Sequence, residues 1–174
     1  MGILKPAAPV KLLVGMITGR PALFEEIRPF LTARFGPIDL ESPVYAWNHT
    51  IYYQRELGPD LKRQFFFFEQ PISPDTLPEI KRFTNALEQR WFRTTSDGNF
   101  RQINLDPGYL APSKIVLATT KDYSHRIYLR DGIFAEVTLV YQGKSFIPLP
   151  HTYPDFRSDE YISLFNEARK RLSG

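Results

Sequence analysis

The amino-acid sequence predicts an α+β fold built on a ferredoxin-like βαββαβ core. Apolar runs of strand length alternate with segments of helical periodicity in the order strand, helix, strand, strand, helix, strand as far as Leu105. The runs that begin at Val10 and Phe65 are apolar on both faces, as the two central strands of such a core require. We expect an antiparallel hairpin and a C-terminal helix to extend this core.

The composition is that of one ordinary globular domain spanning residues 1–174. Apolar residues make up 43% of the chain and charged residues 24%, so extensive disorder is not expected. The net charge of +3 permits an acidic partner without requiring one. Since the chain has no cysteine, disulfides and thiolate chemistry are excluded. With neither a signal peptide nor an apolar run of membrane-spanning length, we expect a cytoplasmic protein that makes no contact with a membrane.

The first strand is expected at Val10 to Ile17, a nearly continuous apolar run. A helix should follow it, because apolar residues recur at helical spacing, and Gly36-Pro37 should end that helix. Pro29 lies inside this pattern and should kink the helix or split it. The apolar positions of the helix are Leu23, Phe24, Ile27, Phe30 and Leu31.

The second strand is expected at Ile38 to Trp47, at an edge of the sheet, because it contains Pro43. A connecting segment or short helix should cover Asn48 to Asp60. The four consecutive phenylalanines from Phe65 to Phe68 cannot be solvated on either face, so the strand that carries them should be central.

The clearest helix is expected at Ser73 to Phe92, where Thr76 and Glu79 match a capping box. A turn-rich loop at Thr94–Asn99 should separate it from a strand that begins at Phe100. The apolar stripe of the helix comprises Leu77, Ile80, Phe83, Leu87 and Trp91.

Three more strands and a final helix should complete the fold. The first of these strands is Lys114–Thr120, and the next two form a hairpin around an Asp131-Gly132 turn. Asp106-Pro-Gly-Tyr109 should be a turn at a strand end, because aspartate, proline and glycine all suit tight turns. Ser158 is expected to cap the last helix.

A two-residue turn fixes the expected register of the hairpin. Arg130 then faces Ile133, and His125 shares a face with Glu136 at a diagonal distance that long side chains can bridge. The same register sends Arg126 to the opposite face. A carboxylate beside a histidine can fix its tautomer and suit it to proton transfer. Equally, such a pair can be a structural hydrogen bond on a half-buried sheet.

These residues define the predicted site, which lies within Asn104 to Glu136 and the segment His151–Asp155. The candidate catalytic residues are His125, Glu136 and Asp106, with Asp106 either binding a divalent metal or assisting as a base. The candidate ligand-binding residues are Lys121, Arg126, Tyr109, Tyr153 and Asp155. The alternatives are a solvated loop for Lys121 and a packed proline turn for the segment that carries Tyr153 and Asp155.

Several familiar site motifs are absent from the sequence. There is no Gly-rich loop ending in Gly-Lys-Ser/Thr and no Gly-x-Gly-x-x-Gly, so the common nucleotide cradles are missing. His49-Thr50 and His151-Thr152 lack the intervening residue that paired His-x-Thr motifs need to place both side chains on one strand face. The spacing of the three histidines does not suit a histidine-rich zinc site.

Motifs across most of the chain resemble a prokaryotic family known only as a domain of unknown function. They include Tyr52-Tyr53 with Glu56-Leu-Gly58, Asn104–Tyr109, Ala118–Tyr128, Gly132–Leu139 and Thr152–Asp155. Members of that family are similar in length and are sometimes labelled GTP-binding. The resemblance implies no established activity, and the missing phosphate loop gives the label no support.

The leading functional expectation is a small cytoplasmic enzyme or ligand-binding protein that acts on a phosphorylated or otherwise anionic small molecule. The alternative is a nucleotide- or RNA-binding module without catalysis, using aromatic and basic residues around Tyr52, Tyr53, Arg55, Lys62 and Arg63. A third possibility is a protein-interaction scaffold.

Overall fold

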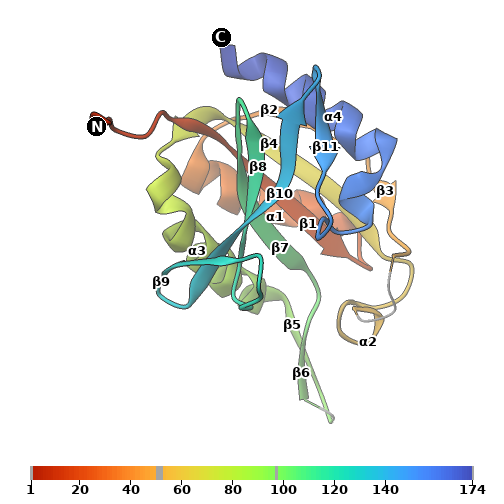
Figure 1. Cartoon of the computed structure of the whole chain (residues 1–174). Coiled ribbons are helices and arrows are strands. Elements are labelled where there is room, and N and C mark those ends of the chain that lie inside the picture. Colours follow the sequence, from red (N-terminus) through yellow and green to blue (C-terminus); the bar gives the residue numbers. More distant parts are fainter. Residues whose placement is uncertain (1, 50–52, 97, 174) are drawn as a thin grey trace.

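The computed structural model describes residues 2–49, 53–96 and 98–173, which form a large antiparallel sheet with helices on both faces (Figure 1). The main path of the sheet runs β11-β10-β8-β7-β1-β4-β2, and every pairing is antiparallel. Along this path the strands are β11 (Ser145–Pro148), β10 (Ile133–Gln142), β8 (Lys114–Thr119), β7 (Asn104–Ala111), β1 (Val10–Thr18), β4 (Lys62–Ile72) and β2 (Ile38–Glu41).

In the described ranges, four shorter strands lie off this path. β3 (Tyr45–Ala46) pairs with β4, and β9 (Ile127–Arg130) pairs with β10. β5 (Phe92–Thr95) and β6 (Gly98–Arg101) form a separate hairpin that projects from the rest of the molecule (Figure 1). The residues expected to form a loop before the fourth core strand therefore lie largely in this hairpin.

Helices close the two faces of the sheet. α1 (Ala22–Phe35) and α3 (Leu77–Glu88) pack on the face that carries Leu12, Phe66 and Phe68. α4 (Asp159–Lys170) packs on the face that carries Phe65 and Phe67. The remaining helical segments are α2 (Gln54–Leu57) and the 3₁₀ turns Pro74–Thr76, Gln89–Trp91, Asp155–Arg157 and Arg171–Ser173.

The phenylalanine run occupies the interior position that its sequence demands. β4 lies between β1 and β2, and all four side chains from Phe65 to Phe68 are buried. Alternation along the strand sends two of them to each face, so one strand supplies aromatic packing to both layers. Full burial of each ring contributes about 1.5–3 kcal/mol.

Several local expectations are confirmed. β1 covers the predicted first strand, and β2 lies at the sheet edge. α1 ends at Gly36 as expected, where the backbone N–H of Gly36 donates a hydrogen bond to the carbonyl of Thr32. The Ser158 hydroxyl accepts a hydrogen bond from the N–H of Tyr161 and so caps α4. Asp131 and Gly132 both have positive φ, as a tight hairpin turn requires.

Other expectations differ from the structure in whole or in part. Of the two outcomes expected at Pro29, a kink or a split, the split does not occur, because α1 runs unbroken through this residue. The predicted second strand is divided into β2 and β3, with Pro43 between them. Thr76 forms no capping bond, because its hydroxyl instead donates to the carbonyl of Ser73. The fold also contains a strand, β11, that the sequence did not predict.

The main correction concerns Asp106-Pro-Gly-Tyr109, which lies inside β7 and is not a turn. β7 and β8 pair only between Gly108–Ala111 and Lys114–Leu117. Beyond that point β7 continues along β1 alone, whereas β8 continues along β10. Pro107 lies just past the last β7–β8 pair, so the strand accommodates a residue without an N–H there. The sheet therefore splits at this sequence.

Candidate functional site

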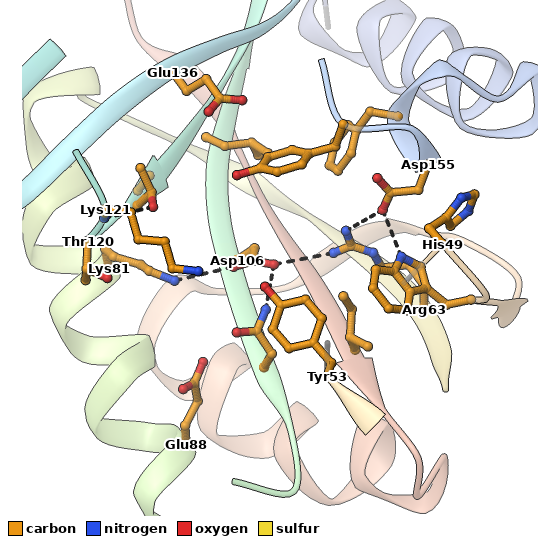
Figure 2. Close-up of a pocket in the computed structure, with 18 of the residues that line it drawn as sticks. His49, Tyr53, Arg63, Lys81, Glu88, Asp106, Thr120, Lys121, Glu136 and Asp155 are labelled. Atoms are coloured by element: carbon orange, nitrogen blue, oxygen red, sulfur yellow. Dashed lines mark hydrogen bonds and ion pairs between the residues drawn. The ribbon is translucent and has the colours of Figure 1, made fainter. Parts of the chain in front are cut away.

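A cavity of about 540 Å³ lies where β7 and β8 separate (Figure 2). It falls within the range of about 300–1,000 Å³ typical of small-molecule sites. Residues far apart in the chain line it. They are Ile17, Trp47, His49, Tyr53, Arg63, Lys81, Asn85, Glu88, Arg101, Asn104, Asp106, residues 117–121, Glu136 and residues 153–156.

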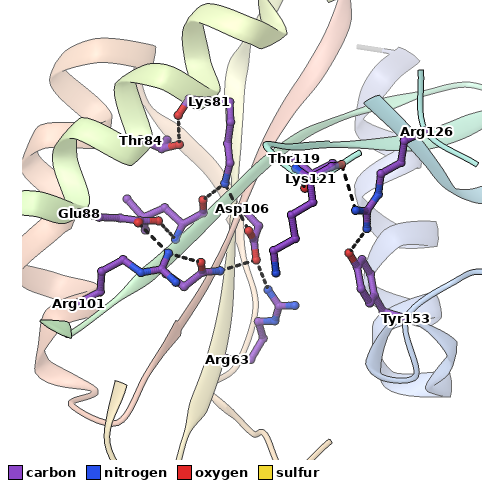
Figure 3. Close-up of polar contacts among 12 residues, drawn as sticks. Arg63, Lys81, Thr84, Glu88, Arg101, Asp106, Thr119, Lys121, Arg126 and Tyr153 are labelled. Carbon is purple, nitrogen blue, oxygen red and sulfur yellow. Dashed lines mark hydrogen bonds and ion pairs between the residues drawn. The ribbon is translucent and has the colours of Figure 1, made fainter. Parts of the chain in front are cut away.

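Asp106 on β7 lies at the centre of a cluster of cations. Its carboxylate is 3.5 Å from Lys81 Nζ and 3.6 Å from Arg63 Nη1, and it accepts a 2.6 Å hydrogen bond from Asn104 Nδ2. The Lys121 side chain extends toward the same carboxylate from the end of β8 (Figures 2 and 3). The distances from Asp106 to Lys81 and to Arg63 are both longer than a normal charge-assisted hydrogen bond of about 2.7–2.9 Å.

Arg63 on β4 is almost completely buried, with its side chain 4% exposed. Its Nη2 donates to Asp155 Oδ2 at 2.8 Å, and the same oxygen accepts a hydrogen bond from Trp47 Nε1 at 2.9 Å. Among the residues that the structure describes, Arg63 Nη1 has no hydrogen-bond partner. Arg63 is therefore a buried cation with a donor that the surrounding described residues do not satisfy.

Gly15 on β1 provides the space for this guanidinium. A Cβ atom at Gly15 would lie 3.0 Å from Arg63 Nη1 and 2.9 Å from the ring of Phe65. The pairing of Gly15 with Asp106 across β1 and β7 brings the carboxylate to the same place. Absence of a side chain at this one position therefore lets the cation approach the split in the sheet.

Lys81 enters the cavity from α3. Its Nζ donates to the carbonyl of Leu105 at 2.8 Å, and its side chain is 7% exposed. An ammonium group has three donors, so this bond and the long contact with Asp106 leave capacity for a further acceptor.

A second ionic cluster supports the lower wall of the cavity (Figure 3). Arg101 bonds to Glu56 through two nitrogens, to Glu88 at 3.0 Å and to Asn104 at 2.9 Å. The hydrogen bond with Glu56 raises the pKa of Arg101, whereas burial raises the pKa of Glu88. Glu88 also accepts the backbone N–H of Leu105 at 2.7 Å. Arg101 thereby ties α2 to α3 and β7.

The expected contact between His125 and Glu136 is present, with Nε2 and Oε2 3.0 Å apart. The expected position of Arg126 is wrong, because its Nε donates to the same Glu136 oxygen at 2.9 Å and its Nη2 donates to Tyr153 Oη at 2.7 Å. A bulge in β9 shifts the register, so that Tyr128 pairs with Phe134 rather than Ala135. Both His125 and Arg126 precede β9.

The predicted site residues divide into two groups. Glu136, Asp106, Lys121, Tyr153 and Asp155 line the cavity. The other three, His125, Arg126 and Tyr109, are not among its lining residues.

The residues outside the cavity have other neighbours. The ring of His125 stacks on His151, with centroids 4.2 Å apart. Tyr109 packs beside a small cluster formed by Leu77, Val116, Ala118 and Ile133.

Sequence reasoning named Arg63 only for the alternative nucleic-acid module, and it missed Lys81, Glu88 and Arg101 as site residues. Two sequence patterns indicate three of these residues, Arg63, Lys81 and Glu88. Lys81 and Glu88 share the α3 face of Leu77 at intervals of four and seven residues, which makes them charges on a buried stripe. Arg63 alternates with Phe65 and Phe67 on β4, which places a charge on an apolar strand face.

The donors around Asp106 do not suit the metal that the sequence allowed. Among the described residues, no group of three or more histidine, aspartate or glutamate side chains is arranged to hold a metal ion. The carboxylate instead faces Lys81 and Arg63, whose positive charges oppose a cation beside it.

We also find that no helix in the described ranges is long and apolar enough to cross a membrane.

Comparison with protein families matches residues 8–172 to a domain of unknown function (DUF4416). Comparisons with curated proteins and with solved structures found no match.

Proposed function

This chain belongs to the DUF4416 family, a domain of unknown function, and we propose that it binds a small molecule through a phosphate or carboxylate group. The anionic group lies between Arg63, Lys81 and Lys121, next to Asp106. Asp106 is then the carboxylate placed to exchange a proton with the ligand. This proposal keeps the anionic ligand expected from the sequence and moves its centre from His125 to Asp106.

The observation that carries the proposal is the group of three cations, Arg63, Lys81 and Lys121, that lines the cavity together with Asp106, while the buried Nη1 of Arg63 has no hydrogen-bond partner among the described residues. Leaving a buried donor without an acceptor costs about 1–3 kcal/mol, and more for a charged group. Asp155 already occupies Nη2, and Asp106 is too distant from Nη1 for a hydrogen bond. An anionic oxygen in the cavity could accept a hydrogen bond from Lys81 Nζ and balance the positive charge of Arg63.

A nucleic-acid interface has less support. Arg63, which that alternative needs on the surface, is buried in the cavity wall. Tyr52 lies outside the described residues. The cavity instead offers an enclosed site of small-molecule size.

We further propose that β1, α1, β2, β4, α3 and β7 form a ferredoxin-like unit. The antiparallel order β7-β1-β4-β2, with α1 and α3 on one face, supports it. In this arrangement β8 and the strands beyond it extend the unit, and the site forms at their junction.

Calorimetric titration with inorganic phosphate tests the binding proposal. We expect the Lys81→Met and Lys121→Met variants each to bind phosphate at least ~10-fold more weakly than the unmodified protein, as loss of a charge-assisted hydrogen bond predicts. Lys121 is exposed, so its variant should fold normally. Lys170→Met on the exposed side of α4 is the matched control and should bind like the unmodified protein. Equal phosphate affinity in all four proteins would refute the assignment.

A further inference from the structure

The wall of the cavity formed by Trp47, His49, Tyr53 and residues 153–156 is aromatic. Trp47, His49, Tyr53, Tyr153 and Phe156 contribute rings to the lining. Aliphatic surface from Ile17, Leu117 and Ala118 adds to the same cavity. A phosphate or carboxylate group alone is much smaller than 540 Å³, so the cavity has room beside these residues for the rest of a ligand.

The aromatic rings meet one another at steep angles. Trp47 and Tyr53 have centroids 5.6 Å apart and planes inclined by 60°. Trp47 meets His49 at 5.8 Å and 68°. Neither contact is a face-to-face stack, so a flat ring in the cavity could supply an offset stacking contact, a geometry that aromatic pairs favour.

Tyr53 places an aromatic ring next to the cation cluster. Its side chain lies beside Asp106 in Figure 2. Burial, reinforced by the negative charge of Asp106, raises the pKa of Tyr53 to about 12. The pKa of Tyr153 is raised as well, chiefly through burial. Both phenols therefore stay neutral at physiological pH and add no charge to the wall that would repel an anion.

We infer that the ligand carries its anionic group on a flat aromatic or conjugated ring, which packs against Tyr53 and Trp47 while the anion contacts Arg63 and Lys81. This inference rests on the proposed anion site. A hydroxyl-rich sugar body fits less well, because its hydroxyls would be buried against rings and aliphatic side chains at a desolvation cost. A saturated ring of equal size would fill the space without the stacking contact.

Three probes separate the two proposals: inorganic phosphate, phenyl phosphate and cyclohexyl phosphate. Since the chain has two tryptophans, the Trp91→Phe background leaves Trp47 as the fluorescent reporter. We expect phenyl phosphate to change the Trp47 emission and to bind about 10-fold more tightly than cyclohexyl phosphate, as one aromatic contact predicts. Tyr53→Leu should remove that preference. Tyr128→Leu, on exposed β9, is the control.

The outcomes distinguish which proposal fails. If phenyl and cyclohexyl phosphate bind equally while inorganic phosphate also binds, the aromatic inference is wrong and the anion site stands. If none of the three probes binds, both proposals are wrong. If Tyr53→Leu keeps the full preference for phenyl phosphate, the ring does not pack where we place it, and the inference is likewise overturned.

Discussion

Gly108 of β7 and Leu117 of β8 form the last pair before the two strands separate. A Cβ atom at Gly108 would lie 2.4 Å from the carbonyl oxygen of Val116 and 2.7 Å from Leu117 Cδ2. The strands can approach this closely only because position 108 has no side chain. The cavity opens immediately beyond this contact, so the position of the split depends on glycine here.

Gly108→Ala should therefore destabilise the protein. The added methyl group meets a backbone atom that cannot rotate away, and overpacking of this kind costs about 1–3 kcal/mol. Urea unfolding measures the change in the free energy of unfolding. Gly2→Ala, whose Cβ would meet nothing within 4 Å, is the control and should change stability by less than about 0.5 kcal/mol. A neutral Gly108→Ala would show that the strands do not meet as described.

The Arg63–Asp155 pair predicts how stability falls in acid. Burial by itself would raise the pKa of Asp155, but the charge and hydrogen bond of Arg63 dominate and lower it below its ordinary value of 3.8. A carboxylate with a lowered pKa stabilises the fold above its unfolded pKa, and the contribution is lost as pH falls through the folded pKa. Asp155→Asn should make the loss of stability below about pH 4 shallower, as measured by urea unfolding across pH.

The same substitution should be costly at neutral pH. The neutral amide of the Asp155→Asn variant cannot balance the charge of the buried Arg63 guanidinium, and loss of one partner of a buried ion pair costs about 3–5 kcal/mol. Glu167→Gln, which breaks an exposed pair with Lys170, is a control expected to cost no more than about 1 kcal/mol. A neutral-pH effect of Asp155→Asn as small as that of the control would contradict the buried pair.

Glu88 should have the opposite pH dependence. Burial raises its pKa above the ordinary value of 4.5, so the folded state holds the proton more tightly than the unfolded state does. Its contribution is complete below the unfolded pKa and is lost as pH rises through the folded pKa. In Glu88→Gln, the decline in unfolding free energy from about pH 4.5 upward should be smaller than in the unmodified protein. An unchanged slope would be incompatible with a raised pKa.

The Glu136 cluster should be structural in its effect. Glu136 is 2% exposed and accepts hydrogen bonds from Arg126 and His125, so Glu136→Gln should destabilise the fold by about 3 kcal/mol. His125 does not line the cavity, and His125→Ala should leave phosphate affinity within about three-fold of that of the unmodified protein. Urea unfolding measures the stability of the Glu136→Gln variant, and calorimetric titration measures the phosphate affinity of the His125→Ala variant. A His125→Ala protein of normal stability that no longer binds phosphate would restore His125 to the site.

Much of the fold follows from patterns that survive tertiary context. The two-sided apolar run at Val10, the phenylalanines from Phe65 and the Asp131-Gly132 turn each have one physically reasonable placement, and the structure has them there. The turn expected at Asp106-Pro-Gly108 does not form, because pairing with β1 overrides the local preference of these residues for a turn. The register of β9 depended on a bulge that no local pattern specifies.

The site was only partly predictable for a related reason. Asp106 and Lys121 were predictable as site residues because they lie near other acidic, basic and cationic residues in the stretch Asn104 to Glu136. Arg63 and Lys81 lie elsewhere in the chain, on β4 and α3, and only the folded sheet brings them to Asp106. The sequence indicates Arg63 and Lys81 only as charges on otherwise apolar faces. This pattern predicts a buried ion but does not identify its partner.

The most direct test of the central claim is a crystal structure of the protein soaked with tungstate, an electron-dense analogue of phosphate. We predict anomalous density inside the cavity, beside Arg63 and within hydrogen-bond distance of Lys81 Nζ. The Lys81→Met crystal should lose that density. Tungstate bound only at exposed lysines and arginines, with the cavity free of density, would contradict the account.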